Sequence, residues 1–346
     1  MILLIALALQ FPGPSRALRL RPEDVDSLPL AATRVEEGRR LIIELPAIEV
    51  PAEGSIRTPV FRAAVPFDVS LYGFDAFVVD EAGRTMPRDR LHHFTLIDPD
   101  RRGLFFPLAL PIFGVSKESP RPVLPKYLVG VPLPAGGRYI ASAMLANPEA
   151  RQRRMRVRVV LSFVRPGRIF PLFRAYPWTM DATSPLGGEG GRHDFDLPPG
   201  RSSHSWEGSP LIPGTILGMG GHAHDYATAI QLLDVTTGDT IWHQAPLRDA
   251  AERVLSIPPA RFYRWYRLGI HIQPSHTYRV TVFYDNPTGA NIPFGGMGSV
   301  AGLLIPDRGV TWPSADRRDP AYRSHINNLL SNMAGMGRGE TPHAHH

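Results

Sequence analysis

Apolar and polar residues alternate along many short segments of this chain. Alternation with a period of two is the pattern of a β-strand with one buried face. The 36 prolines and 32 glycines punctuate these segments and predict turns, and few stretches show the period of a helix. The pattern therefore predicts an all-β fold. The clearest predicted strands cover residues 40–45, 67–72, 155–164, 278–284 and 299–305.

The length of the chain and the spacing of its strands predict two domains. With 346 residues and 43% apolar content, the chain can bury two substantial cores. We expect two tandem antiparallel β-sandwiches of jelly-roll type, at residues 18–165 and 175–310. Residues 98–135 are apolar and rich in proline, and they predict a long connection that caps a cavity or docks on the second domain. The polar, glycine-rich residues 311–346 predict a flexible tail that contains methionine and histidine.

The first residues are similar to an export signal. An apolar run at residues 1–9 precedes a small-x-small cleavage pattern at Ser15, Arg16 and Ala17, without a basic start. We expect a signal segment at residues 1–17 and an extracytoplasmic location, periplasmic or secreted; a buried first strand is the alternative. No later apolar run reaches the roughly 20 residues that span a bilayer, so no membrane span is predicted. The absence of cysteine excludes disulfides and thiolate metal ligands.

The positive charge of the chain does not predict a nucleic-acid partner. The formal net charge is +6 and the pI is about 9.8, but the arginines are scattered. The densest group, at residues 151–158, alternates with apolar residues, as the outer face of a strand does. No nucleic-acid motif accompanies it, so we expect no nucleic-acid partner. The chain also lacks a Gly-x-Ser-x-Gly elbow and a phosphate loop, so nothing supports hydrolase or nucleotide chemistry.

Two histidines, His222 and His224, follow a glycine-rich turn at residues 218–221 and lead into a predicted strand. On a strand, residues two apart face the same way with Cα atoms roughly 7 Å apart. Two imidazoles at this spacing can bind one metal ion at about 2 Å each. The glycines, which have no side chain, are expected to leave room for the ion and its solvent.

A second glycine turn, at residues 295–298, contains Met297 and precedes the last predicted strand. A methionine between glycines has few neighbouring side chains to bury it, so a role as a thioether ligand is favoured over a place in the core. Two imidazoles and one thioether suit copper, and Cu(I) especially, better than zinc, calcium or magnesium. The sequence therefore predicts a copper site at His222, His224 and Met297.

The order of His222-x-His224, a β-region and Met297 before a final strand resembles the copper type II, ascorbate-dependent monooxygenases. These are the peptidylglycine α-hydroxylating and dopamine β-monooxygenases, and the likeness covers roughly residues 175–310. It implies that the copper ion there binds dioxygen and abstracts hydrogen from a small-molecule or peptide substrate. A reductant such as ascorbate would supply electrons, and the chain would be a divergent, bacterial-type member of the family.

An adjacent pair, His92 and His93, lies on a predicted strand at residues 91–97. Neighbouring residues on a regular strand face opposite ways, so the pair alone does not predict a shared ion. The resemblance implies that it belongs to a second copper site, which relays electrons and takes a third histidine from a later strand. No histidine occurs between His93 and His193, and Met144 stands near the expected place. One or two copper ions, as Cu(I) or Cu(II), are therefore expected.

Two alternatives remain open at this point. His271 lies on a predicted strand and could join His222 and His224 in a three-histidine site of the zinc or iron type. The chain could also bind copper without catalysis, for storage, delivery or sensing outside the cytoplasm, because the family mechanism needs both metals. Histidines at the end of the chain could also capture copper loosely: His343, His345 and His346.

Overall fold

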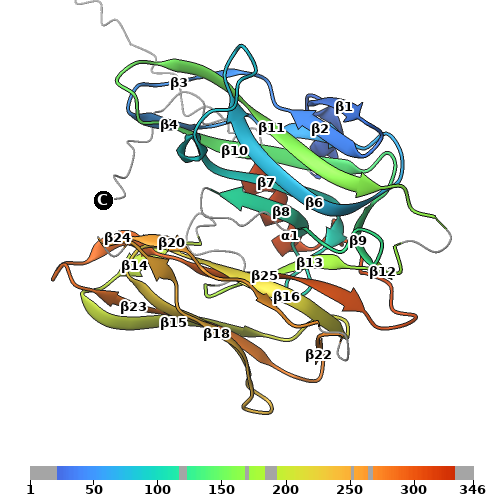
Figure 1. The fold of residues 1–346 in the computed structure, drawn as a ribbon. Helices are drawn as coiled ribbons and strands as arrows, with labels where there is room; N and C mark the ends of the chain where they lie inside the picture. The colour runs from blue at the N-terminus through green and yellow to red at the C-terminus, as the bar shows by residue number, and fades with distance from the viewer. Residues whose placement is uncertain are drawn as a thin grey trace, which may run out of the picture.

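The structure of the chain, a computed structural model, describes residues 22–116, 123–167, 171–183, 193–250, 253–263 and 268–331. The predicted signal segment at residues 1–17 and the three terminal histidines lie outside these ranges. The all-β prediction is confirmed, because antiparallel strands form two stacked sandwiches (Figure 1). Within the described ranges, no helix is long and apolar enough to cross a membrane.

The first sandwich packs a seven-stranded sheet on a five-stranded sheet. The larger sheet has the order β1–β2–β11–β6–β9–β12 with β3 on β11: β1 Ala32–Glu36, β2 Arg40–Glu44, β3 Ile48–Val50, β6 Val69–Val79, β9 Val129–Leu133, β11 Arg153–Val164 and β12 Phe173–Arg174. The smaller sheet has the order β4–β10–β7–β8 with β5 on β10: β4 Gly54–Arg57, β5 Phe61–Ala64, β7 Leu91–Arg102, β8 Ala109–Ser116 and β10 Arg138–Asn147. Short 3₁₀-helices precede β1 and β7: η1 Pro22–Ser27 and η2 Arg88–Arg90.

The second sandwich packs a five-stranded sheet on a four-stranded sheet. The five-stranded sheet has the order β13–β25–β16–β21 with β22 on β16: β13 Tyr176–Asp181, β16 Gly214–Ala223, β21 Ala260–Arg261, β22 Ile270–Ile272 and β25 Gly298–Pro306. The four-stranded sheet has the order β15–β23–β17–β18: β15 Gly200–Gly208, β17 Ala227–Asp234, β18 Thr240–Gln244 and β23 Tyr278–Asn286. Two small pairs complete the domain: β14 Phe195–Leu197 with β24 Ile292–Gly296, and β19 Leu247–Arg248 with β20 Val254–Ser256.

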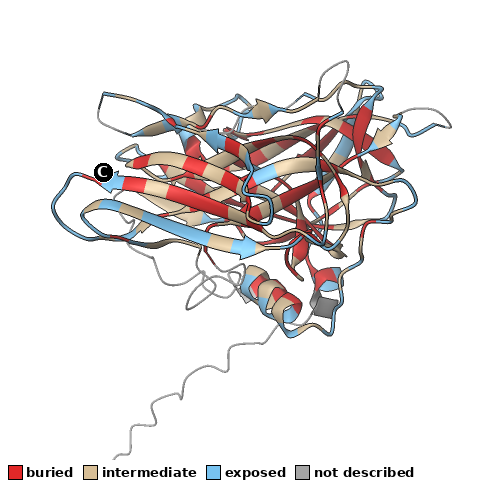
Figure 2. Cartoon of the chain, turned by 90° about the horizontal axis from the view of Figure 1, so that it is seen from below, coloured by how far each residue is buried: buried red, intermediate tan, exposed pale blue. Residues whose placement is uncertain are grey.

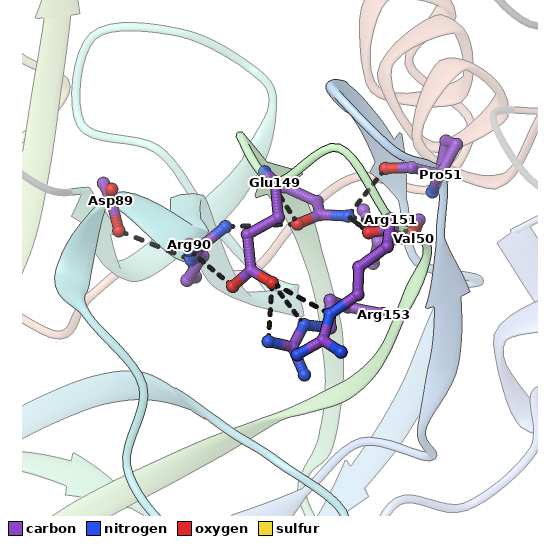
Figure 3. A network of polar contacts seen from close by, with 8 residues as sticks. Val50, Pro51, Asp89, Arg90, Glu149, Arg151 and Arg153 are labelled. Carbon is purple, nitrogen blue, oxygen red and sulfur yellow. Dashed lines mark hydrogen bonds and ion pairs between the residues drawn. The ribbon is translucent and has the colours of Figure 1, made fainter.

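The two sandwiches repeat one strand order. Strands β2–β11–β6–β9 of the first correspond to β13–β25–β16–β21 of the second, and β4–β10–β7–β8 correspond to β15–β23–β17–β18. The repeat extends to a side chain, because β10 ends at Asn147 and β23 ends at Asn286, and each is followed by proline. The amide nitrogen of each asparagine donates to the carbonyls of a residue–proline pair on a neighbouring strand connection and to the carbonyl four residues ahead. In the first sandwich, a charged network of Arg90, Glu149 and Arg153 surrounds this corner (Figure 3).

An apolar loop joins the two sandwiches. Leu104, Phe105 and Phe106, between β7 and β8, are buried although they lie outside any strand. Phe105 packs on the rings of Trp178 and Tyr278 in the second domain, at centroid distances of 5.7 and 6.4 Å. The expected docking of the proline-rich connection on the second domain is thus observed. Residues 98–135 also contain strands β8 and β9, which were not predicted because the region is rich in proline.

The expectation of a flexible tail from residue 311 is wrong for residues 311–331. Helix α1, Pro320–Ser331, begins after Asp319, whose carboxylate accepts the backbone N–H of Ala321 at 2.7 Å. Tyr322, Ile326 and Leu330 recur at helical spacing and are buried on the first sandwich. Figure 2 shows buried residues on one side of this helix and exposed ones on the other. The chain therefore returns from the second domain to cover part of the first.

Candidate metal centre

A β-bulge at His92 changes the directions in which the adjacent side chains of His92 and His93 point. In the pairing of β7 with β10, His93 lies opposite Met144 and Leu91 lies opposite Leu145, so His92 is an extra residue without a register partner. Leu91 and Phe94 are both buried, which a regular strand does not allow at a spacing of three. The bulge leaves both histidines outside the core, with their Nδ1 atoms 3.1 Å apart. Because bulges redirect side chains, the two rings approach each other although their residues are adjacent on one strand.

Met144 lies beside the histidine pair on the same sheet face. Directly opposed residues of antiparallel strands have Cβ atoms roughly 5 Å apart, which brings the Met144 side chain to His93. Arg57 on β4 is the next residue in this row, opposite Met144 on its other side. The predicted residues His92, His93 and Met144 are thus brought together, and an arginine that sequence reasoning missed stands next to them.

The second set is built where β16 ends and β25 begins. His222 lies opposite Ser299, and Ala223 lies opposite Gly298. Ala223 is buried and its neighbours are not, so His222 and His224 are on the outer face of the sheet. Their rings meet edge to face with centroids 5.5 Å apart. His224 directly follows β16 and Met297 directly precedes β25, next to the last pair of this register.

The Tyr284 hydroxyl group ties these two strand ends together. It accepts the backbone N–H of His224 at 3.2 Å and that of Met297 at 2.9 Å, and it donates to the carbonyl of Met297. One donor and two acceptors exhaust the capacity of a hydroxyl group. Burial raises the pKa of Tyr284 to about 12, so it remains a neutral phenol. Sequence reasoning placed this tyrosine on a strand but gave no signal of its bonds.

The glycines near both ligands serve close packing, which corrects the expectation that they leave room for an ion. A Cβ atom added at Gly218 would lie 2.6 Å from the carbonyl oxygen of Ala260 on β21. One added at Gly298 would lie 2.6 Å from Val282 in the core. Both distances are shorter than any non-bonded contact allows. Glycine is required at these positions by neighbouring strands.

The two sets of residues belong to sheets that contact each other at the domain interface. The sheet that contains β7 and β10 is the layer of the first sandwich nearest the second, and it lies over β16 and β25 (Figure 1). Its edge strand β8 contacts β13 of the facing sheet. Burial lowers the pKa of His93 to about 3, and nearby positive charges add to this effect. Those charges belong to His92, Arg57 and His222.

His271 lies far from the histidine pair. It is opposite Thr215 on β16, seven positions before His222, which corresponds to roughly 20 Å along a strand. Its Nε2 atom is 3.0 Å from the carboxylate of Asp307. A single ion cannot bind His222, His224 and His271, so the three-histidine alternative does not fit this geometry.

The donors present fit copper better than a harder metal ion. Across the part of the chain that the structure describes, no three His, Cys, Asp or Glu side chains gather in a way that could hold a metal ion. An ion at His222 and His224 therefore needs a donor of another type, and the backbone of Met297 is joined to that of His224 through Tyr284. Thioethers bind Cu(I) and are poor ligands for zinc, calcium and magnesium.

Comparisons with known proteins show no family for this chain. No family model matches the chain, and no curated protein matches it. Among solved structures, the major capsid protein P2 of bacteriophage PM2 is 11% identical, covering 82% of this chain and 98% of that one with a TM-score of 0.33. PNGase F, a glycosylasparaginase from Flavobacterium meningosepticum, is 10% identical, covering 79% and 97% with a TM-score of 0.40. Such low values carry no argument about function.

Proposed function

We propose that the chain is a copper protein of the type II monooxygenase kind, with copper held by His222, His224 and Met297. The observation that carries the proposal is the hydroxyl group of Tyr284, which bonds to the backbone of both His224 and Met297. This supports a metal site because it joins the backbone at two of the proposed ligands, close to the third ligand in sequence, His222.

Copper bound by these residues would supply dioxygen binding and removal of a hydrogen atom from an unreactive C–H bond, as the resemblance implies. The balanced reaction is R–H + O2 + 2 H+ + 2 e− → R–OH + H2O, with the electrons from ascorbate or another reductant. In this proposal the imidazoles hold the ion and Met297 favours its reduced form. Tyr284 fixes the ligand backbone, and the facing sheet of the first sandwich limits access of bulk water.

A second candidate is binding of copper without catalysis, for storage, delivery or sensing outside the cytoplasm. Met144 favours it, because a methionine stands where the resemblance implies the third histidine of an electron relay. A set with two histidines and one methionine suits retention of Cu(I). Both candidates share the site at His222, His224 and Met297 and differ only in chemistry.

Copper affinity tests the shared site. After anaerobic loading with Cu(I), the affinity is measured by competition with a chromogenic chelator for the wild type, His222→Ala, His224→Ala and Met297→Leu. Loss of a direct ligand should weaken binding by more than the roughly 10–100-fold that outer partners contribute. His271→Ala is the matched control and should leave the affinity unchanged. Wild-type affinity in all three ligand variants would show that the proposed site is wrong.

Oxygen consumption then separates the two candidates. The loaded protein is mixed with ascorbate and with small-molecule or peptide substrates, and oxygen uptake and hydroxylated product are measured. Substrate-dependent uptake that His224→Ala abolishes supports the monooxygenase. Tight copper binding without any uptake supports storage or delivery.

A further inference from the structure

Strand β15, Gly200–Gly208, is an end strand of the four-stranded sheet in the second sandwich. Its nine residues keep one antiparallel register with β23, from Gly200 opposite Asn286 to Gly208 opposite Tyr278. Among the strands of the described ranges, β23 is the only one that pairs with β15. The backbone N–H and C=O groups on the other side of β15 can therefore pair with a strand of another molecule.

The other end strands of the four large sheets have protection that β15 lacks. Strands β12 and β21 have two residues each, β4 has four, and β1 and β18 have five. Strand β8 is longer but contains Pro111 and two irregularities in its register, and β13 contains Pro177. Short length, proline and bulges prevent an edge from pairing with a second chain. Strand β15 has nine residues and contains no proline, lysine or shift of register.

The sequence of β15 is complementary to itself in an antiparallel pair. When His204 lies opposite His204 of the partner subunit, Arg201 lies opposite Glu207, Ser203 lies opposite Ser205, and the terminal glycines lie opposite each other. Arg201 and Glu207 are six residues apart and so share one face of the strand, with side chains 91% and 44% exposed. The twofold symmetry of such a pair makes the contact between opposite charges occur twice.

The neighbouring strand extends this charge pattern. On β23, Asp285 lies opposite Arg201 and Arg279 lies opposite Glu207. Two paired copies of β15 would therefore place four charges of alternating sign in a row across four strands. The order is Asp285 and Arg201 of one copy, then Glu207 and Arg279 of the partner subunit. A row of this kind favours the antiparallel register centred on His204, because a shift of two residues removes the opposition of charges.

We propose that β15 pairs with β15 of a second copy of this chain, so that the two four-stranded sheets become one continuous sheet about a twofold axis at His204. The four-stranded sheet is the layer of the second sandwich farther from the first (Figure 1). The interface is thus on the opposite side of the second sandwich from the contact between the domains. It does not depend on the proposed copper function, because His222 belongs to the other sheet of this sandwich.

Analytical ultracentrifugation of the full-length chain over a range of concentrations measures the monomer–dimer equilibrium. Arg201→Glu and Glu207→Arg each place like charges opposite each other twice, and each should raise the dissociation constant of the dimer by about 10-fold. The double variant restores opposite charges across the interface and should recover part of the lost affinity. Arg318→Glu reverses an exposed arginine next to α1 and is the control that should leave the equilibrium unchanged. Thermal unfolding confirms that each variant is folded.

Disulfide cross-linking tests the register, because the chain contains no cysteine. In the proposed dimer the two copies of residue 204 lie directly opposite each other, with Cα atoms roughly 4.5–5.5 Å apart, which a disulfide can bridge. His204→Cys should therefore give a covalent dimer on mild oxidation, whereas Thr240→Cys, on the other end strand β18, should not. A chain that remains monomeric at every concentration overturns the proposal. A dimer that is insensitive to the charge reversals, or that His204→Cys does not cross-link, also overturns it.

Discussion

In both sandwiches an asparagine side chain bonds to the backbone at the corresponding strand end. The histidines, by contrast, lie on sheets that do not correspond in the two sandwiches. Asn147 and Asn286 occupy corresponding strand ends and bond to corresponding carbonyls. The histidines of the first domain lie on β7, whereas those of the second lie where β16 ends, and these strands do not correspond in the repeated order. The duplicated scaffold therefore does not explain the sites. Each candidate set instead lies on a sheet that takes part in the contact between the two domains.

Substitution of the two corresponding asparagines, Asn147 and Asn286, should cause the largest loss of stability. Asn286→Ala and Asn147→Ala each remove several buried hydrogen bonds, and we expect each to lower the free energy of unfolding by about 3 kcal/mol in urea denaturation. In contrast, Asn147→Asp and Asn286→Asp should lower the free energy of unfolding by different amounts. Arg90 donates to the Asn147 side chain at 3.2 Å and can compensate a carboxylate there, whereas the second corner has no arginine among its described bonding partners. Equal costs for Asn147→Asp and Asn286→Asp would contradict this account.

Acid should weaken the packing of helix α1, which follows the second domain in the sequence but packs on the first. His325 on α1 accepts the backbone N–H of Ala109 through Nδ1 at 3.2 Å. Burial, with the charge of His193, lowers the pKa of His325 from 6.5 to about 4. The unfolded chain then binds more protons between these values, so stability is complete above pH 6.5 and is lost as the pH falls towards 4.

We expect this loss to be on the order of 2 kcal/mol. Urea denaturation at several pH values measures it, and His325→Gln, which keeps an acceptor without a proton site, should remove that part of the pH dependence. The exposed His243→Gln serves as the control. An identical pH profile for His325→Gln and the wild type would show that this histidine does not titrate on unfolding.

Substitution of Tyr284 or Tyr139, one buried tyrosine from each sandwich, should have the smallest effect on stability. Tyr284→Phe leaves two backbone N–H groups without their acceptor and should cost about 1 kcal/mol, and it should also weaken copper binding. Tyr139, in the first sandwich, has a buried hydroxyl group with no hydrogen-bond partner among the described atoms. Tyr139→Phe should therefore be neutral or slightly stabilising. Thermal unfolding and chelator competition measure both variants, and equal effects would refute the role of Tyr284.

Alternation along the chain was enough to predict the all-β fold and several of its longer strands. In β11, Met155, Val157 and Leu161 are fully buried, and the arginines between them face Glu44 and other surface carboxylates, as the pattern predicted. Spacing alone also placed His222 and His224 on one face. These features depend on residues close together in sequence, where the period of a strand is decisive.

Features that depend on distant residues could not be predicted. The bulge at His92 follows from the burial of Leu91 and Phe94 against a core that the local pattern does not contain. The electrostatic effect of His222 on His93 depends on how the two domains pack together. Helix α1 was missed because its buried face has only three large apolar residues, and their partners lie in the first sandwich, far away in sequence.

The docking of α1 has a consequence for the order in which the protein is made. During synthesis the first sandwich leaves the ribosome long before α1, since domains fold from the N-terminus as they emerge. Until α1 arrives, Val25, Ile97 and Ile140 lack the cover that Tyr322 and Ile326 provide in the finished protein. The domain that is synthesised first is therefore completed last, and it waits with an exposed apolar surface while the whole second sandwich is translated.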